Sequence, residues 1–422
     1  MIGNLERINV NYNLNIYYIK TNKFNTNSIN IIFEDYLNSE NNTKNSLLCA
    51  VLRRGCSKFP NIIDINFHLD KLYGATLICR IIKKGHKQIL QFSIEFVSNK
   101  YIKENDISKA SLEFLLELIT RPLLDNNRFK SEYFIQEKED LRNLLNSNSN
   151  DVLQYAYHKC LFKQNEGDSI SLSEFGDPDF IDSISLDDLY EQWLKLFKCK
   201  KSILFFGDIN LKDALDTINS FHILLSHSNR QNDCINLNKR VFNNEIKEIN
   251  EVFRISESIL NIGLSMENYS IKEDYVKLLL YNEILGNGRS SRLFKKIRNA
   301  GLAYFSQSII NKFTGSIIIT CGISSENKQE IYKKIEEQLE DMRSGNILDT
   351  EFETSKNIIE ENLFNLQDNR FDLLDFYIDQ IVLNNFFCIN EFIDNLKEIS
   401  KKEMIDVSKR IKINTILYLS NK

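Results

Sequence analysis

The sequence has few histidines, and none of them has the spacing of a helical metal site. Five occur in 422 residues, and no two form His-x-x-x-His. The nearest two, His222 and His227, are five positions apart, so they do not share one helix face as residues i and i+4 do. A pair of histidine ligands on one helix is therefore excluded.

The spacing of the eight cysteines indicates neither a metal site nor a redox pair. No Cys-x-x-Cys occurs, which argues against a thiolate zinc site and against a redox motif. Unpaired thiols are typical of a reducing compartment, so we expect the protein in the cytoplasm. The chain also lacks an apolar run of the roughly 18 residues that a membrane span requires, and its start has no apolar segment typical of a secretion signal.

Proline (3 residues) and glycine (14 residues) are scarce, which excludes collagen-like and low-complexity classes. The net charge of −5 argues against nucleic acid as the main partner, because phosphate binding requires a basic surface. A local basic group, Lys83, Lys84 and Lys87, surrounds Gly85. We interpret it as a solvated hairpin turn.

What the sequence does contain is a repeated order of elements, over a length suited to two domains. In the first half, a strand at 29–33 precedes helices at 45–54 and 64–73 and a hairpin at 75–96. In the second half, a strand at 260–266 precedes helices at 273–285 and 291–298 and a hairpin at 304–323. This order predicts an α+β fold of two homologous domains, each an antiparallel-rich sheet packed with helices.

The expected domains cover residues 1–225 and 251–422, and the polar residues 226–250 form the expected linker. Gly286 and Gly288 form Gly-Asn-Gly, but they follow a helix rather than a strand, which is the wrong context for a dinucleotide site. We interpret them as a glycine-terminated helix followed by a turn.

Several segments, in order, resemble the insulinase-like (pitrilysin) family of zinc peptidases. They are RRGCSKFP (53–60), LDKLYGA (69–75), EYFIQEKEDL (132–141), FFGDI (205–209) and GNGRSSRLFKKIRNAGLAY (286–304). The resemblance covers nearly the whole chain and implies two domains of the LuxS/processing-peptidase type. Within the family it is greatest to bacterial members associated with the 5-aminopentanol modification of elongation factor P.

Active members of that family carry His-x-x-Glu-His on a helix. The two histidines bind zinc, the glutamate activates the zinc-bound water, and a glutamate on another helix completes the site. By the resemblance, the histidine positions fall on Ser46 and Ala50, and the catalytic glutamate falls on Cys49. The third ligand falls on Leu144, with Glu137 retained earlier on the same helix. The resemblance thus implies a degenerate site with no metal and no cofactor.

Substitute ligands are not indicated. Cys49 lies among apolar neighbours, which is typical of a core cysteine. His158 and Cys160 form His-x-Cys without further ligands, and we interpret both as structural. A self-sufficient peptidase with unusual ligands is disfavoured, because nothing replaces the two imidazoles.

The second half keeps more of the family pattern. The resemblance assigns Arg298 and Tyr304 to the pair that donates hydrogen bonds to the scissile carbonyl of a substrate held at a partner's zinc. The turn between them is one residue shorter than the family spacing. The structural alternative is that Tyr304 begins a core strand and Arg298 caps a helix end.

Two functional hypotheses follow from the resemblance. In the first, the chain is an inactive subunit that pairs with a zinc-binding His-x-x-Glu-His homologue, forms part of a chamber around a peptide substrate, and supplies Arg298 and Tyr304. In the second, it is a scaffold in a modification or peptide-maturation pathway and does not support cleavage.

Overall fold

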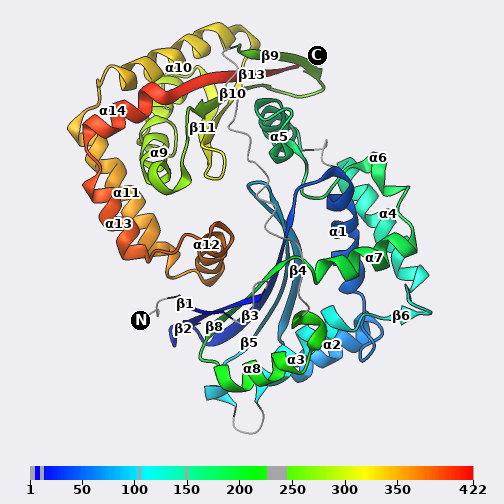
Figure 1. The fold of residues 1–422 in the computed structure, drawn as a ribbon. Helices are drawn as coiled ribbons and strands as arrows, with labels where there is room; N and C mark the ends of the chain where they lie inside the picture. Colours follow the sequence, from blue (N-terminus) through cyan, green and yellow to red (C-terminus); the bar gives the residue numbers. More distant parts are fainter. Residues whose placement is uncertain (1–4, 10–13, 103–105, 148–150, 226–244, 422) are drawn as a thin grey trace. The chain divides into compact units, whose positions relative to one another are not determined.

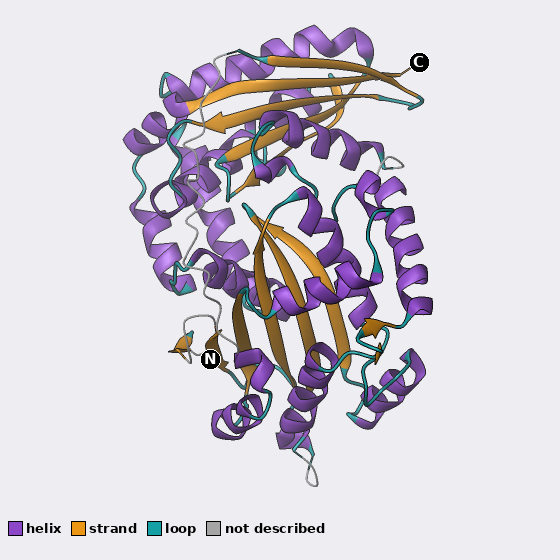
Figure 2. Ribbon diagram, turned by 45° about the vertical axis from the view of Figure 1, so that its right-hand side comes forward, coloured by secondary structure: helices purple, strands orange, loops and turns teal. Residues whose placement is uncertain are grey.

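The computed structural model describes residues 5–9, 14–102, 106–147, 151–225 and 245–421 (Figure 1). They form two compact units. The first takes the described residues up to 147 together with 172–225 and 381–386, and the second takes 151–171, 245–380 and 387–421. Each unit consists of a β-sheet with helices packed on it, so the α+β class is confirmed (Figure 2).

The first sheet has six strands in the order β1-β2-β8-β3-β5-β4. β2 and β8 are parallel, and the other neighbours are antiparallel. Alternate residues of β3, such as Ile29, Ile31 and Phe33, lie in the apolar core beneath the helices. The strands are β1 (Glu6–Asn9), β2 (Leu14–Lys20), β3 (Thr26–Tyr36), β4 (Thr76–Lys84), β5 (Lys87–Val97) and β8 (Lys200–Gly207), and a separate ribbon pairs β6 (Leu124–Asp125) with β7 (Arg128–Phe129).

The second sheet has five strands in the order β9-β13-β10-β12-β11, which matches β2-β8-β3-β5-β4 strand for strand. β9 and β13 form its parallel pair, as β2 and β8 do in the first sheet. The repeat predicted from the two hairpins is therefore present in the topology. These strands are β9 (Lys247–Phe253), β10 (Ser258–Met266), β11 (Ala303–Asn311), β12 (Ser316–Ile323) and β13 (Ile411–Asn421).

Helices complete each unit. Those of the first unit are α1 (Ser39–Leu52), α2 (Ile62–Lys71), η1 (Asn99–Tyr101), α3 (Ile107–Thr120), α4 (Ser131–Ser147), α6 (Pro178–Ile181), α7 (Leu186–Leu196), α8 (Leu211–Asn219) and η3 (His222–Leu225). Those of the second are α5 (Val152–Gln164), η2 (Ser169–Ser171), α9 (Ile271–Leu285), η4 (Phe294–Arg298), η5 (Ser325–Asn327), α10 (Lys328–Arg343), α11 (Asp349–Leu366), α12 (Arg370–Leu383, except its last turn), α13 (Ile389–Glu398) and α14 (Lys401–Arg410). None of the helices in the described ranges is long and apolar enough to cross a membrane.

Each unit is built from several separate stretches of the chain, whereas each expected domain, 1–225 and 251–422, is one continuous stretch. α5 comes from the first half, yet its residues Ala156 and Cys160 pack with Ile259 and Leu417 of the second sheet. The reason is physical: the apolar face of a helix lies where it removes most surface from water, whatever its place in the sequence. Burial raises the pKa of Cys160 to about 12, as suits a structural thiol.

The expected linker also differs in part. Residues 226–244 lie outside the described part of the chain. Lys247–Phe253 is strand β9, paired in parallel with β13. The last residues of the predicted linker therefore belong to the second sheet.

Candidate functional site

Helix α1 carries three of the four positions that the family pattern assigns to zinc chemistry. Its start is defined by Asn38, whose side chain accepts hydrogen bonds from the backbone N–H groups of Glu40 (3.0 Å) and Asn41 (3.3 Å). Leu47 and Leu48 anchor its apolar face in the core beneath the first sheet. The helix is therefore fixed both at its end and along its length.

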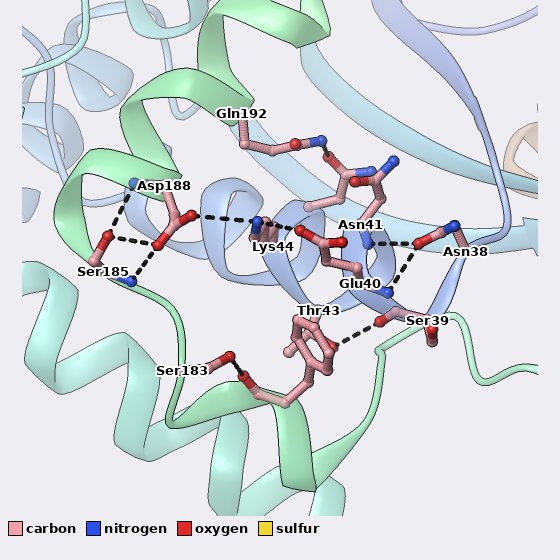
Figure 3. Close-up of polar contacts among 12 residues, drawn as sticks. Asn38, Ser39, Glu40, Asn41, Thr43, Lys44, Ser183, Ser185, Asp188 and Gln192 are labelled. Carbon is pink, nitrogen blue, oxygen red and sulfur yellow. Dashed lines mark hydrogen bonds and ion pairs between the residues drawn. The ribbon is translucent and has the colours of Figure 1, made fainter.

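The polar face of α1 is bound to helix α7. Figure 3 shows Lys44 between Glu40 of its own helix, at 2.7 Å, and Asp188, at 3.4 Å. One turn further along α7, Gln192 Nε2 donates to Asn45 Oδ1 at 2.7 Å. Because buried polar groups must find partners, these bonds fix the rotation of α1 about its axis.

Residues 172–177, the covering segment, lie against α1 and are held by side chains that donate to their backbone. Asn42 Nδ2 donates to the carbonyl oxygen of Ser173 at 2.9 Å. Gln88 Nε2 and Ser46 Oγ both donate to the carbonyl oxygen of Glu174, at 2.5 Å and 3.3 Å. The hydroxyl at the first histidine position is thus engaged by the protein's own chain.

The covering segment touches the helix backbone at Gly176. This residue has φ +102°, and a Cβ there would lie 2.6 Å from Thr43 Cα. The backbone N–H of the next residue, Asp177, donates to Thr43 Oγ1 at 3.0 Å. Only glycine permits so close an approach at this backbone conformation.

The hairpin lysines also contact this region, which corrects our interpretation of a solvated turn. Lys83 Nζ donates to the carbonyl oxygen of Leu172 at 2.9 Å and lies 3.9 Å from the Glu174 carboxylate. Lys87 Nζ forms an ion pair with Glu34 at 2.7 Å. The sequence showed the charges but not the acidic partners, which are distant along the chain.

The four degenerate positions have different surroundings. Ser46 is buried, Ala50 is half-buried, and Cys49 is only 3% exposed. Burial, with a smaller contribution from the Glu137 carboxylate, raises the pKa of Cys49 to about 12. Leu144 on α4 is 43% exposed and makes no part of a buried site.

Glu137 lies beside Cys49, about two turns before Leu144 on α4. It is 3% exposed, and its Oε1 is 3.4 Å from Arg54 Nε. Burial raises the pKa of Glu137, and the guanidinium groups of Arg53 and Arg54 oppose that rise. Glu137, the acidic residue that the family pattern retains on α4, is therefore paired with Arg54.

These groups do not fit a zinc ion. Ala50 and Leu144 have no donor atom, the Ser46 hydroxyl is engaged by Glu174, and burial raises the pKa of the Cys49 thiol, which disfavours the thiolate form that zinc binds. Across the described ranges, no three His, Cys, Asp or Glu side chains are grouped so that they could hold a metal. We derive no metal chemistry for this chain.

The second candidate site lies at the start of β11. Ala303 pairs with Ile323 and Phe305 pairs with Gly322, so Tyr304 is the extra residue of a β-bulge. A bulge redirects its side chain, and here Tyr304 is 55% exposed, with its hydroxyl 3.3 Å from Ser324 Oγ. Tyr304 is the second residue of β11, close to the strand start that the structural alternative expected, but its side chain is outside the core.

The helix expected at 291–298 contains a π-helical turn, η4, in which Asn299 N donates to the carbonyl oxygen of Phe294 at 2.9 Å. Arg298 ends this turn, is exposed, and lies with its guanidinium carbon 5.9 Å from the centre of the Phe294 ring. Single π-turns are frequent at functional sites. Arg298 and Tyr304 are both accessible to another molecule.

Sequence reasoning gave no role to Arg292, which anchors η4. It is buried and forms an ion pair with Glu351 of α11. Gly286 was expected only to end a helix. It also lies against β11, where a Cβ would be 2.6 Å from Ser308 Oγ, and its carbonyl oxygen accepts a bond from Ser308 N at 3.2 Å.

Comparisons with known proteins agree with this architecture. Residues 183–359 match the family model described as "Peptidase M16 inactive domain". The chain is 26% identical over 411 residues to "Probable inactive metalloprotease YmfF" of Bacillus subtilis (strain 168), covering 96% of this chain and 95% of that protein.

Solved structures show the same fold. A conserved protein of Enterococcus faecalis V583 has a TM-score of 0.90 at 24% identity, covering 100% of this chain and 99% of that one. A protease from Helicobacter pylori has a TM-score of 0.77 at 14% identity, covering 99% and 100%. By the matched domain model and the full-length relative, the chain is similar to the M16, or insulinase-like, peptidase family, and the solved structures share its fold.

Proposed function

We propose that this chain is a catalytically inactive subunit that pairs with a zinc-binding His-x-x-Glu-His homologue to form a peptide-cleaving heterodimer. The observation that carries the proposal is the contrast between its two sites. Ser46 and Cys49 are enclosed by the protein's own chain, whereas Arg298 and Tyr304 are exposed. A surface that keeps its donors exposed suits a substrate that another subunit cleaves.

In the proposed pair, the partner supplies the metal and the activated water. The guanidinium of Arg298 and the hydroxyl of Tyr304 donate hydrogen bonds to the scissile carbonyl oxygen as it gains negative charge. Donors positioned in advance at a developing oxyanion are worth about 10²–10³ in rate. This chain would also form part of the wall of the chamber that encloses the peptide.

The peptide would be held as an added strand at a sheet edge. β11 and β4 are terminal strands of their sheets. The edge of β11 is covered at Ser308, whose N–H donates to Gly286. We therefore propose β4 as the edge of this chain better suited to a peptide strand.

The resemblance names two settings for such a pair, elongation factor P modification and the maturation of a ribosomally made peptide, both in the cytoplasm. Isolating the chain from its native host with its bound partner distinguishes the proposed peptidase pair from a scaffold. Recovery of a His-x-x-Glu-His homologue supports the proposed pair, and recovery of a modification enzyme without one supports the scaffold.

The direct test reconstitutes the chain with a His-x-x-Glu-His homologue and measures peptide cleavage. Tyr304→Phe is expected to lower kcat by about 10²-fold, because it removes one donor to the oxyanion. The matched control is Tyr101→Phe: Tyr101 is also 55% exposed and also has a hydroxyl bonded to another side chain, that of Asn25. The control should leave the rate unchanged.

Other outcomes decide against the proposal. An unchanged rate for Tyr304→Phe favours the scaffold. Stoichiometric zinc bound by the chain alone, or failure to associate with such a homologue, would contradict the idea of an inactive partner subunit.

A further inference from the structure

A stretch of the second unit has an unusual charge. Residues 284–325, which include η4, β11 and β12, contain six Lys or Arg residues and no Asp or Glu. At the overall frequency of 58 acidic residues in 422, a stretch of 42 residues would hold about six. The protein as a whole carries −5, so this stretch has a net charge opposite to that of the rest of the sequence.

Two of the six cations are neutralised by acidic residues from elsewhere in the unit. Arg292 pairs with Glu351, and Lys312 pairs with Asp379. These contacts belong to the packing of α11 and α12 and need no external partner.

The other four cations form the basic turn: Arg289, Lys295, Lys296 and Arg298. All four are exposed, and none takes part in an ion pair with the residues that the structure describes. The nearest preceding acid, Glu283, is buried, and its carboxylate accepts a bond from Asn287 Nδ2 at 2.6 Å. Burial raises the pKa of Glu283.

The lysines of the basic hairpin in the first unit, by contrast, have acidic partners. Lys83 lies 3.9 Å from the Glu174 carboxylate, and Lys87 lies 2.7 Å from that of Glu34. Clustered like charges repel one another unless an opposite charge offsets them. In the basic turn, the described residues supply none.

We propose that the basic turn and the adjoining start of β11 bind an acidic peptide segment, with its carboxylates paired to the four cations and its chain beside Tyr304. This inference names the chemistry of the peptide in the proposed function. It rests on that proposed function for the role of the bound peptide. A short acidic segment fits better than nucleic acid, because a long polyanion would extend over a surface that is net negative.

The test measures fluorescence anisotropy of a labelled glutamate-rich peptide, and of its glutamine counterpart, with the full chain alone at an ionic strength of about 0.1 M. The glutamate peptide should bind about 10-fold more tightly or better. The triple variant Arg289→Gln/Lys295→Gln/Lys296→Gln should lose that preference. It leaves Arg298 in place, so the effect is separate from the proposed catalytic contact.

A matched triple variant controls for net charge. Lys333, Lys402 and Lys409 are exposed cations of the same unit outside the basic turn, and their replacement by Gln removes the same charge. This control should bind within about 2-fold of the wild type, since these lysines are not part of the proposed site and salt screens the charges of exposed side chains. Wild-type affinity should also fall as salt is raised, a measurement that needs no variant.

Equal affinity for the two peptides, or equal loss in both triple variants, overturns the inference. So does tighter binding of a single-stranded oligonucleotide or of phosphatidylglycerol vesicles than of the glutamate peptide. The assay contains no partner subunit and no metal. Failure of pairing with retained peptide binding therefore refutes only the proposed heterodimer, and the reverse result refutes only the acidic ligand.

Discussion

The α1 region of the first unit and the η4–β11 region of the second hold the two sets of residues that the family pattern assigns to chemistry, in different surroundings. Around α1, Ser46 bonds to Glu174 and Cys49 is buried beside Glu137. Around η4, Arg298 and Tyr304 are exposed. The first region is satisfied within the chain, and the second keeps donors that another molecule can use.

The difference shows how the polar face of α1 is stabilised by the chain itself. Buried polar groups require partners, so the face of α1 is satisfied by the covering segment and by α7. An exposed surface has water as its partner and carries no such requirement. The predictions below test this comparison by placing equivalent changes in the two regions.

The largest effect is expected when a carboxylate is placed in each region. Cys49→Glu restores the catalytic residue type but buries a charge beside Glu137, and should lower the free energy of unfolding by about 3–5 kcal/mol. Arg298→Glu, at an exposed position, should cost less than about 1 kcal/mol. Urea denaturation measures both, and equal costs would show that α1 is not enclosed.

The second prediction concerns the contact between the covering segment and α1. Gly176 and Gly74 both have positive φ, +102° and +73°, but a Cβ at Gly74 meets nothing within 4 Å. Gly74→Ala should therefore cost only backbone strain, about 1–2 kcal/mol. Gly176→Ala should cost a further 1–3 kcal/mol or so from its clash with Thr43. Thermal unfolding of the two variants that gives the same shift would contradict the close packing.

The third prediction uses pH. Because burial raises the pKa of Glu137 in the fold above its ordinary 4.5, the stability from its protonated form is present below pH 4.5 and is lost as pH rises through the folded pKa. Glu137→Gln mimics that protonated form. The unfolding free energy of the Glu137→Gln variant, relative to that of the wild type, should therefore increase from about pH 4 to about pH 7, two values that bracket this titration. Glu132→Gln, exposed on the same helix, is the control, and a parallel trend in both would refute the assignment.

The smallest effects are expected from removing one hydroxyl in each region. Ser46→Ala should cost about 1 kcal/mol, because the Glu174 carbonyl keeps its bond from Gln88. Tyr304→Phe should change the unfolding free energy by less than about 0.5 kcal/mol, since its side chain is exposed. A larger stability loss at Tyr304 than at Ser46 would reverse the comparison.

Much of the fold could be predicted from the sequence. The alternation of Ile29, Ile31 and Phe33 predicted β3, and the two hairpins predicted β4–β5 and β11–β12, because side-chain periodicity is a local property. The predicted repeat is present in the common strand order of the two sheets.

Other features could not be predicted because they depend on distant contacts. α5 packs on the second sheet although it lies in the first half of the sequence. Lys83 and Lys87 are paired rather than solvated, because Glu174 and Glu34 reach them from other elements. The bulge at Tyr304 arises from the register of β11 against β12, which no local pattern shows.

The sequence by itself determined which chemistry is missing: without paired imidazoles, or a donor at Ala50 and Leu144, the chain cannot assemble the family's zinc site. Only the tertiary structure decided what fills the positions that remain. The raised pKa of Cys49, the engagement of Ser46 and the exposure of Tyr304 all depend on neighbours brought from distant parts of the chain. Residue types follow from the sequence, whereas solvation and hydrogen bonding exist only once the chain has folded.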